Sequence, residues 1–244
     1  MKIALASLGF IDKDIIYNKN VIINTLKNFS NKVDIVVFGE AFLQGFDALT
    51  FKYNEDLNMV LSINSNIIKE IEDACKIYNI SVSFGFFEKL NNDFYSSQIT
   101  IDSSGKIINI YRRVSIGWKE KYATKEYKEG KSFNTFLFEN KTITIGLCGD
   151  LWYDENIDII NKLNPDIVLW PVYTDYNYNE WNTNIKYEYL EQASKINAEV
   201  LLVNSYCKNK NDIDTAKGAA LYISNKEIKD EVPSGKEDIL IVEL

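Results

Sequence analysis

The sequence predicts an α/β fold, or an α+β fold, in which helices cover mixed β-sheets. Two observations lead to this prediction: strand-like apolar runs alternate with helical patterns, and turn signals between other runs indicate β-hairpins. The 244 residues fit one large domain or two small ones, and no stretch rich in Pro, Gly or Ser resembles a linker. We therefore expect one domain spanning residues 1–244.

Strands are predicted where apolar and β-branched residues run together. Several of these runs are continuous rather than alternating, which is typical of strands covered on both faces. The predicted strands are residues 2–8, 34–39, 80–88, 97–102, 107–112, 135–139, 142–148, 166–172, 199–206, 218–224 and 239–244. Turn residues at 102–107, 139–142 and 223–228 indicate hairpins.

Helices are predicted between some of these strands, at 15–29, 60–79, 155–163 and 181–197. The clearest helical pattern is that of 60–79, where apolar residues recur along one face of a helix. Its apolar face consists of Ile67, Ile68, Ile71, Ala74, Cys75 and Tyr78. The mixture of strand–helix units and hairpins is what predicts mixed sheets rather than a purely parallel one.

The composition narrows the classes of function. Hydrophobic residues make up 46% and charged residues 25%, as in ordinary soluble proteins. A net charge of −8 and a pI near 4.8 argue against nucleic acid or an anionic membrane as partner. No apolar run approaches the roughly 20 residues that cross a bilayer, and the first residues read as a strand rather than as a leader.

Histidine and cysteine usage narrows the chemistry further. The chain contains no histidine, which excludes histidine general bases and histidine metal ligands. The three cysteines, Cys75, Cys148 and Cys207, show neither a disulfide framework nor zinc spacing, so we expect a reducing cytoplasmic setting. Cys75 is expected to be structural, whereas Cys207 is expected to be an exposed thiol.

Two polar residues directly follow predicted strands, where α/β proteins place their chemistry. Glu40 follows the strand 34–39, and Cys148 ends the strand 142–148 between Gly146 and Gly149. Taken alone, Glu40 could mark a solvated helix N-terminus and Cys148 could be a small buried apolar residue. The glycines also fit a sharp nucleophile elbow, whose backbone N–H groups could receive an oxyanion.

Taken together, these motifs resemble the nitrilase (carbon–nitrogen hydrolase) superfamily, in its amidase-like branch. The segment "VVFGEAF" is similar to the family strand that ends in Pro-Glu, with Gly39 in place of proline. The segment "SSQITIDSSGKIINIYRR" is similar to the family hairpin that leads into Tyr-Arg-Lys, and "IGLCGDLWYDE" is similar to the cysteine motif. Later strands, "LWPVYTD", "LLVNSY" and "KGAALYISNKEIKDE", follow in the family order.

The resemblance implies a four-layer α-β-β-α sandwich, assembled as a homodimer or a larger homo-oligomer. It also implies a hydrolase that cleaves the non-peptide C–N bond of a small amide or N-carbamoyl compound, with no metal and no organic cofactor. By position, Glu40 is the general base and Cys148 the nucleophile that forms an acyl-enzyme. Glu120 is the candidate for the second family glutamate, and Glu126 is the reserve.

Further residues are expected around the substrate. The residues expected to bind it are Gly149, Trp152, Pro171, Tyr173 and Thr174. The aromatic residues among them could equally serve packing or a dimer contact, since aromatic side chains often do. We expect Asp150 to hold the elbow through backbone hydrogen bonds rather than to react.

The sequence departs from the family at the lysine position, where it reads Tyr111-Arg112-Arg113. These are also the only two arginines of the chain. In the account we prefer, Arg113 takes the role of the lysine with a planar, permanently charged group. In a second account Lys119 or Lys121 supplies the ammonium group from the following loop.

The third account is a catalytically impaired protein that binds a ligand without hydrolysing it. This ligand-binding or regulatory function is the main alternative to a hydrolase. A thiol-based redox sensor using Cys148 is a weaker alternative, because no resolving cysteine is near in the sequence.

Overall fold

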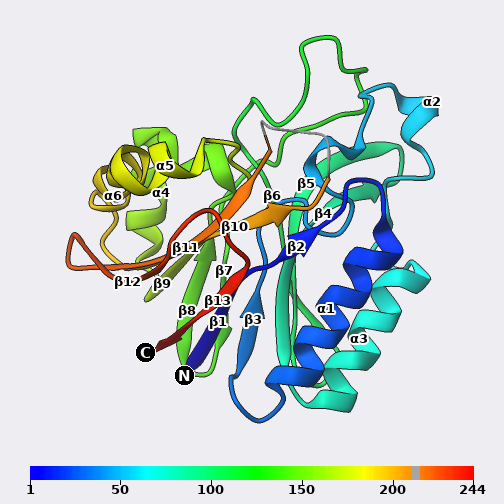
Figure 1. Cartoon of the computed structure of the whole chain (residues 1–244). Coiled ribbons are helices and arrows are strands. Elements are labelled where there is room, and N and C mark those ends of the chain that lie inside the picture. Colours follow the sequence, from blue (N-terminus) through cyan, green and yellow to red (C-terminus); the bar gives the residue numbers. More distant parts are fainter. Residues whose placement is uncertain (210–214) are drawn as a thin grey trace.

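The structure is a computed structural model that describes residues 1–209 and 215–244. In this part of the chain the strands form two mixed β-sheets that face each other, and helices cover the outer face of each sheet (Figure 1). The architecture is a four-layer α-β-β-α sandwich, which confirms the predicted fold. None of the described helices is both long and apolar enough to cross a membrane.

The first sheet has a parallel centre and antiparallel flanks. Its strands, in order across the sheet, are β13 (Asp238–Glu243), β1 (Lys2–Ser7), β3 (Ile35–Val37), β4 (Ser81–Leu90), β5 (Asp93–Ile101) and β6 (Ile107–Arg112). Strands β1, β3 and β4 are parallel, whereas β5, β6 and β13 are antiparallel to the strands that they pair with. Helices α1 (Ile15–Phe29) and α3 (Asn66–Tyr78) cover its outer face (Figure 1).

The second sheet is organised in the same way around three parallel strands, β8, β9 and β10. In order across the sheet lie β12 (Glu227–Val232), β11 (Lys217–Ser224), β10 (Glu199–Cys207), β9 (Ile167–Val172), β8 (Lys141–Ile145) and β7 (Thr135–Phe138), and β2 (Gly9–Phe10) pairs with β10. The outer face is covered by α4 (Asp154–Leu163), α5 (Tyr178–Glu180), a π-helical turn (Trp181–Ile185) and α6 (Lys186–Ala193).

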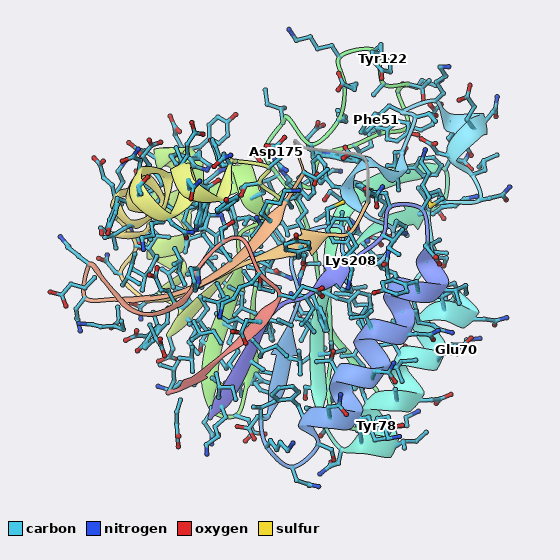
Figure 2. All side chains as sticks on the ribbon, in the orientation of Figure 1. Phe51, Glu70, Tyr78, Tyr122, Asp175 and Lys208 are labelled. Carbon is cyan, nitrogen blue, oxygen red and sulfur yellow. The ribbon has the colours of Figure 1, made fainter. Side chains whose placement is uncertain are left out.

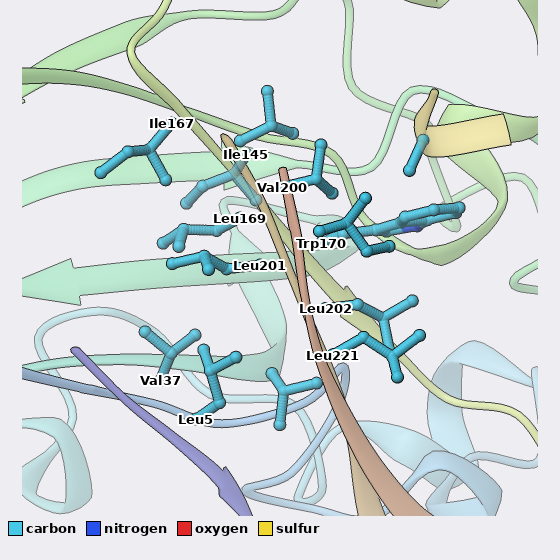
Figure 3. Packing of buried hydrophobic residues seen from close by; sticks show 14 of the residues in the cluster. Leu5, Val37, Ile145, Ile167, Leu169, Trp170, Val200, Leu201, Leu202 and Leu221 are labelled. Atoms are coloured by element: carbon cyan, nitrogen blue, oxygen red, sulfur yellow. The ribbon is translucent and has the colours of Figure 1, made fainter. Parts of the chain in front are cut away.

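Alternation along the strands divides the apolar residues between the layers. In β1, Ile3 and Leu5 join the core between the sheets, whereas Ala4 and Ala6 join the core beneath α1 and α3. In β10, Leu201 is buried among side chains of the same inter-sheet core (Figure 3). Its neighbours in β10 are also buried, which explains the continuous apolar runs in the sequence.

Some predicted boundaries were wrong. Helix α3 begins at Asn66 rather than near residue 60, because the Ser65 hydroxyl accepts the backbone N–H of Ile68 at 3.4 Å and caps the helix there. The helix predicted at 181–197 begins as the π-helical turn and ends at Ala193. Strand β12 was missed because its edge position leaves most of its residues exposed or half-exposed, so the apolar pattern is absent.

The two sheets meet at the end of β3. The backbone N–H of Gly39 donates to the hydroxyl of Ser205, in β10, at 3.2 Å. The N–H of Glu40 donates to the carbonyl of Val172, at the end of β9, at 3.3 Å. A proline at position 39 has no N–H group and could not donate to Ser205. This explains why glycine can replace the family proline here with the gain of one hydrogen bond. These bonds carry Glu40 out of the first sheet and toward the second.

Candidate active site

Glu40 is held at the junction of the sheets with almost no freedom. The residue is 1% exposed, and its Oε1 accepts the hydroxyl of Ser96 at 2.8 Å. The next residue, Ala41, has a φ of +52°, so the chain turns sharply after the carboxylate. Gly85 in β4 permits this turn, because a Cβ there would lie 2.3 Å from the backbone nitrogen of Ala41.

Arg113 follows β6 and lies against this carboxylate. Its Nη1 donates to both oxygens of Glu40, at 3.0 and 3.2 Å, and its Nε donates to the hydroxyl of Ser115 at 2.9 Å. The residue is 5% exposed. Burial opposes its charge, but Glu40, Cys148 and Asp150 outweigh that effect and raise the pKa of Arg113 above its usual value. The guanidinium therefore stays charged.

Cys148 lies on a sharp turn after β8, at the start of a 3₁₀ turn (Cys148–Trp152). Its φ of +42° is unusual for a residue with a side chain, in keeping with the predicted elbow. The thiol is partly buried and donates to the carbonyl of Tyr173 at 3.5 Å. The carbonyl of Cys148 accepts the indole N–H of Trp170, in β9, at 2.9 Å. The turn is thus fixed to the neighbouring strand.

The surroundings keep this thiol protonated at neutral pH. Burial and the negative charge of Glu40 raise the pKa of Cys148 to about 12, against the lowering effect of the positive charge of Arg113. A neutral thiol is a weak nucleophile and needs a base when it attacks. Glu40 is the carboxylate whose charge and hydrogen bonding raise the pKa of this thiol, so it is close enough to accept the proton.

Asp150 joins the cysteine turn to the segment that carries Arg113. Its Oδ1 accepts the backbone N–H groups of Val114 at 3.1 Å and Ser115 at 2.7 Å. Its Oδ2 accepts the N–H of Leu147 at 2.9 Å and the hydroxyl of Tyr111 at 2.5 Å. The aspartate is fully buried and holds the elbow by backbone hydrogen bonds, as predicted.

The residues predicted to bind substrate are divided in the structure. Tyr173 contacts the thiol through its carbonyl, and Gly149 lies directly against the guanidinium of Arg113. Pro171 is buried within β9, and Thr174 is 7% exposed and bonded to Asn204. Trp152 is 40% exposed and packs edge-on against Tyr189 of α6, with the ring centroids 4.9 Å apart.

The two candidates for a second glutamate lie elsewhere, in the long segment between β6 and β7. Glu120 is exposed, and Glu126 is partly exposed with its backbone carbonyl bonded to the N–H of Phe94. Among the described contacts, neither carboxylate reaches Glu40 or Cys148. Figure 2 shows Tyr122 of this segment at the outer end of a loop, at the same end of the molecule as Asp175.

The lysines of this segment do not replace Arg113 in the structure. The ammonium of Lys119 donates to the carbonyl of Tyr127 at 2.6 Å and pairs with Glu129 at 2.7 Å. Lys121 is exposed. The cation that contacts Glu40 is Arg113, which agrees with the preferred account of the sequence.

Several contributing residues were not predicted. Ser96 and Ser115 hold Glu40 and Arg113, but a small hydroxyl residue in a strand or loop carries no distinctive sequence signal.

The second arginine, Arg112, does not take part in this arrangement. Its guanidinium pairs instead with the buried carboxylate of Glu88 at 2.6 Å.

The two cysteines outside the site are both buried. Cys207 is 2% exposed, and its thiol donates to Asp12 at 3.4 Å, so the expectation of an exposed thiol was wrong. Cys75 is fully buried on the inner face of α3, as predicted.

Comparison with known proteins places the chain among hydrolases. A family model described as carbon–nitrogen hydrolase matches residues 10–244. A citrullinase of Francisella tularensis subsp. tularensis is 27% identical over 160 residues, which are 62% of this chain and 55% of the relative. An (R)-stereoselective amidase of Pseudomonas sp. is 24% identical over 170 residues, 69% of this chain and 59% of the relative. The chain thus spans little more than half the length of these relatives.

A solved structure shows the same fold at low identity. A glutamate-to-glutamine mutant of the amidase from Nesterenkonia sp. AN1, with acrylamide added to its active-site cysteine, superposes with a TM-score of 0.82. The match covers 100% of this chain and 93% of that one at 13% sequence identity.

Proposed function

The chain belongs to the carbon–nitrogen hydrolase family, and from this premise we propose that it hydrolyses a small amide or N-carbamoyl compound through Cys148. One observation carries the proposal: a buried carboxylate, a permanently charged guanidinium and a thiol on a strained turn meet where the two sheets join. The names of the relatives support both substrate classes, since one is an amidase and citrulline carries an N-carbamoyl group.

The first half of the proposed reaction forms an acyl-enzyme. Glu40 accepts the thiol proton of Cys148 as the sulfur attacks the carbonyl carbon and the C=O double bond becomes an oxyanion. When the oxyanion collapses, the C–N bond breaks and the amine leaves with the proton that Glu40 had taken. The product of this half is a thioester on Cys148.

The second half releases the acid. Glu40, again a carboxylate, takes a proton from water as the water oxygen attacks the thioester carbon. Collapse of this second tetrahedral intermediate breaks the C–S bond and returns the proton to the sulfur. The balance is one water consumed, with one amine or ammonia and one carboxylic or carbamic acid produced.

Arg113 is proposed to stabilise both tetrahedral intermediates. Its Nη1 and Nε are occupied by Glu40 and Ser115, and among the described residues no acceptor bonds to Nη2, which lies beside Gly149. Nη2 and a backbone N–H of the cysteine turn are therefore the proposed oxyanion donors. The loss of one such donor costs about 3–4 kcal/mol of transition-state stabilisation in enzymes of this kind.

The proposal is tested by ammonia release from a panel of small primary amides and N-carbamoyl amines. We expect Cys148→Ala and Glu40→Gln to abolish turnover, because the first lacks the nucleophile and the second lacks the base. Glu120→Gln is the matched control: the same chemical change at an exposed carboxylate should leave the rate within about twofold, as surface changes usually do. Hydroxylamine added to the wild type should give a hydroxamate, which reports the thioester.

Two results would contradict parts of this proposal. Loss of activity in Glu120→Gln equal to that in Glu40→Gln would contradict the assignment of catalytic residues, because Glu120 would then act in the reaction. Tight binding of amides without ammonia release would instead support the alternative of a ligand-binding protein in which Arg113 holds Glu40 inactive.

A further inference from the structure

Gly149, the residue after the nucleophile, occupies a space that its neighbours leave for glycine alone. A Cβ built on its backbone would lie 2.4 Å from Nη2 of Arg113, a distance that real Cβ atoms essentially never show. It would lie 3.2 Å from the hydroxyl of Ser115 and 3.4 Å from Cζ of Arg113. The crowding therefore comes mainly from the end of one side chain.

The backbone does not require glycine at this position. The φ angle of Gly149 does not lie in the left-handed region, so alanine could adopt the same backbone conformation. In a helical turn alanine would even be the more stable residue, because glycine loses more conformational entropy on folding. The reason for glycine is thus the space taken by Arg113.

The guanidinium cannot leave this space without cost. Its Nη1 is bonded to Glu40 and its Nε to Ser115, and the side chain is almost fully buried. A side chain at position 149 would push Nη2 away and tilt the planar group, which would break at least one of these bonds. The positions of the base and of the proposed oxyanion donor would then change together.

We infer that Gly149 is a positioning residue for Arg113, and that the missing side chain at 149 is what permits an arginine beside the nucleophile. The inference rests on the proposed function for its catalytic consequence. It also makes a prediction about lysine. A lysine at 113 ends where the Cζ atom of the arginine lies, 3.4 Å from the Cβ position, which is an ordinary contact. The 3.2 Å contact with the Ser115 hydroxyl would remain, but without the bond to Nε of Arg113 this hydroxyl could turn away. Alanine at 149 should therefore be compatible with lysine and incompatible with arginine.

The test is a cycle of four proteins: the wild type, Gly149→Ala, Arg113→Lys and the double variant. We expect Gly149→Ala to lower kcat about 100-fold in the wild-type background, as a displacement near 1 Å can. In the Arg113→Lys background the same change should alter kcat less than about threefold, whereas additive effects would give the same loss in both backgrounds. An equal loss in both backgrounds would overturn the inference, because Gly149 would then act without Arg113.

A second readout does not depend on turnover. The positive charge of Arg113 favours the thiolate of Cys148, so its displacement should slow alkylation of Cys148 by iodoacetamide at fixed pH. Gly149→Ala should slow this reaction with arginine at 113 and not with lysine. If the wild type released no ammonia, the proposed function would fail, while this cycle would still decide the inference. If both alanine variants failed to fold, the inference would be wrong, because lysine should relieve the crowding.

Discussion

At the scale of single residues, arginine and lysine are not equivalent beside Glu40. A lysine would present one ammonium group to the carboxylate, whereas Arg113 divides its donors among Glu40, Ser115 and the space over Gly149. The planar group thereby fixes its own orientation with two bonds. A site built in this way depends on the shape of the cation as well as on its charge.

The motifs predicted three of these residues and not their supports. Glu40, Arg113 and Cys148 were inferred because each follows a strand within a recognisable pattern, and the structure brings them together. Ser96 bonds to Glu40 from a distant part of the sequence, and Ser115 bonds to Arg113 two residues before it. A single serine hydroxyl carries no distinctive pattern in either case. The prediction for Glu120 is not supported by a described contact with Glu40 or Cys148. Spacing along a loop does not determine where the loop leads.

The raised pKa of Cys148 predicts the pH dependence of its alkylation. With a pKa of about 12, the thiolate fraction rises about tenfold per pH unit from pH 7 upward, and so should the rate with iodoacetamide. In Glu40→Gln the profile should move to lower pH, because the carboxylate that raises the pKa is gone. The labelled residue is identified by mass spectrometry over pH 7–10.

This prediction separates two kinds of cysteine. A rate that is already independent of pH near neutrality would show a preformed thiolate and would contradict a raised pKa of Cys148. The same variant should lose ammonia release, since no group then remains to protonate the leaving amine.

At the scale of elements, the site depends on the connection between the cysteine turn and the end of β6. Asp150 makes this connection by accepting four donors with two oxygens. The substitution Asp150→Asn would replace one acceptor oxygen by an NH₂ group. About two buried donors would lose their acceptor, at a cost on the order of 1–3 kcal/mol each in the free energy of unfolding. Urea denaturation measures the loss.

A milder variant serves as the control for this prediction. Tyr111→Phe removes one of the four donors and leaves the carboxylate to accept the three backbone N–H groups. We expect a smaller loss of stability than in Asp150→Asn. If the two variants were equally stable, the backbone bonds to Asp150 would contribute little.

The elements themselves were predictable to different degrees. Helix α1 (Ile15–Phe29) has the predicted bounds, because an Asp14 cap and an amphipathic pattern mark it locally. The strands at the sheet centres are similarly clear, since burial on both faces demands apolar residues throughout. The short helix α2 (Tyr53–Asp56) has no such signal, and it is stabilised by contacts from distant parts of the chain, such as Tyr127 with Asp56.

At the scale of the whole molecule, the buried thiols predict how stability changes with pH. Burial raises the pKa of Cys75 to about 12, from 9.0 when the thiol is exposed. Between these values the unfolded chain releases a proton that the folded protein retains. Folding is therefore progressively disfavoured as pH rises, by about 1.4 kcal/mol per pH unit from this thiol.

The slope can be measured by urea denaturation at a series of pH values from 8 to 11. Cys75→Ala should be less stable than the wild type at pH 8, but its free energy of unfolding should fall less steeply above pH 9. Parallel curves for the two proteins would show that the pKa of Cys75 is the same in the folded and unfolded states, which would contradict this prediction.

The meeting of the two sheets at Gly39 and Glu40 has a broader consequence. The proposed base follows a strand of one sheet and the proposed nucleophile follows a strand of the other. At the end of β3 the two sheets are joined by one bond to the Ser205 hydroxyl and one bond to the Val172 carbonyl. The distance between the Cys148 thiol and the Glu40 carboxylate therefore depends on how closely the two sheets pack. Turnover should therefore be sensitive to slight loosening of the interior, because a misplacement of about 1 Å between reacting groups can cost about 100-fold in rate.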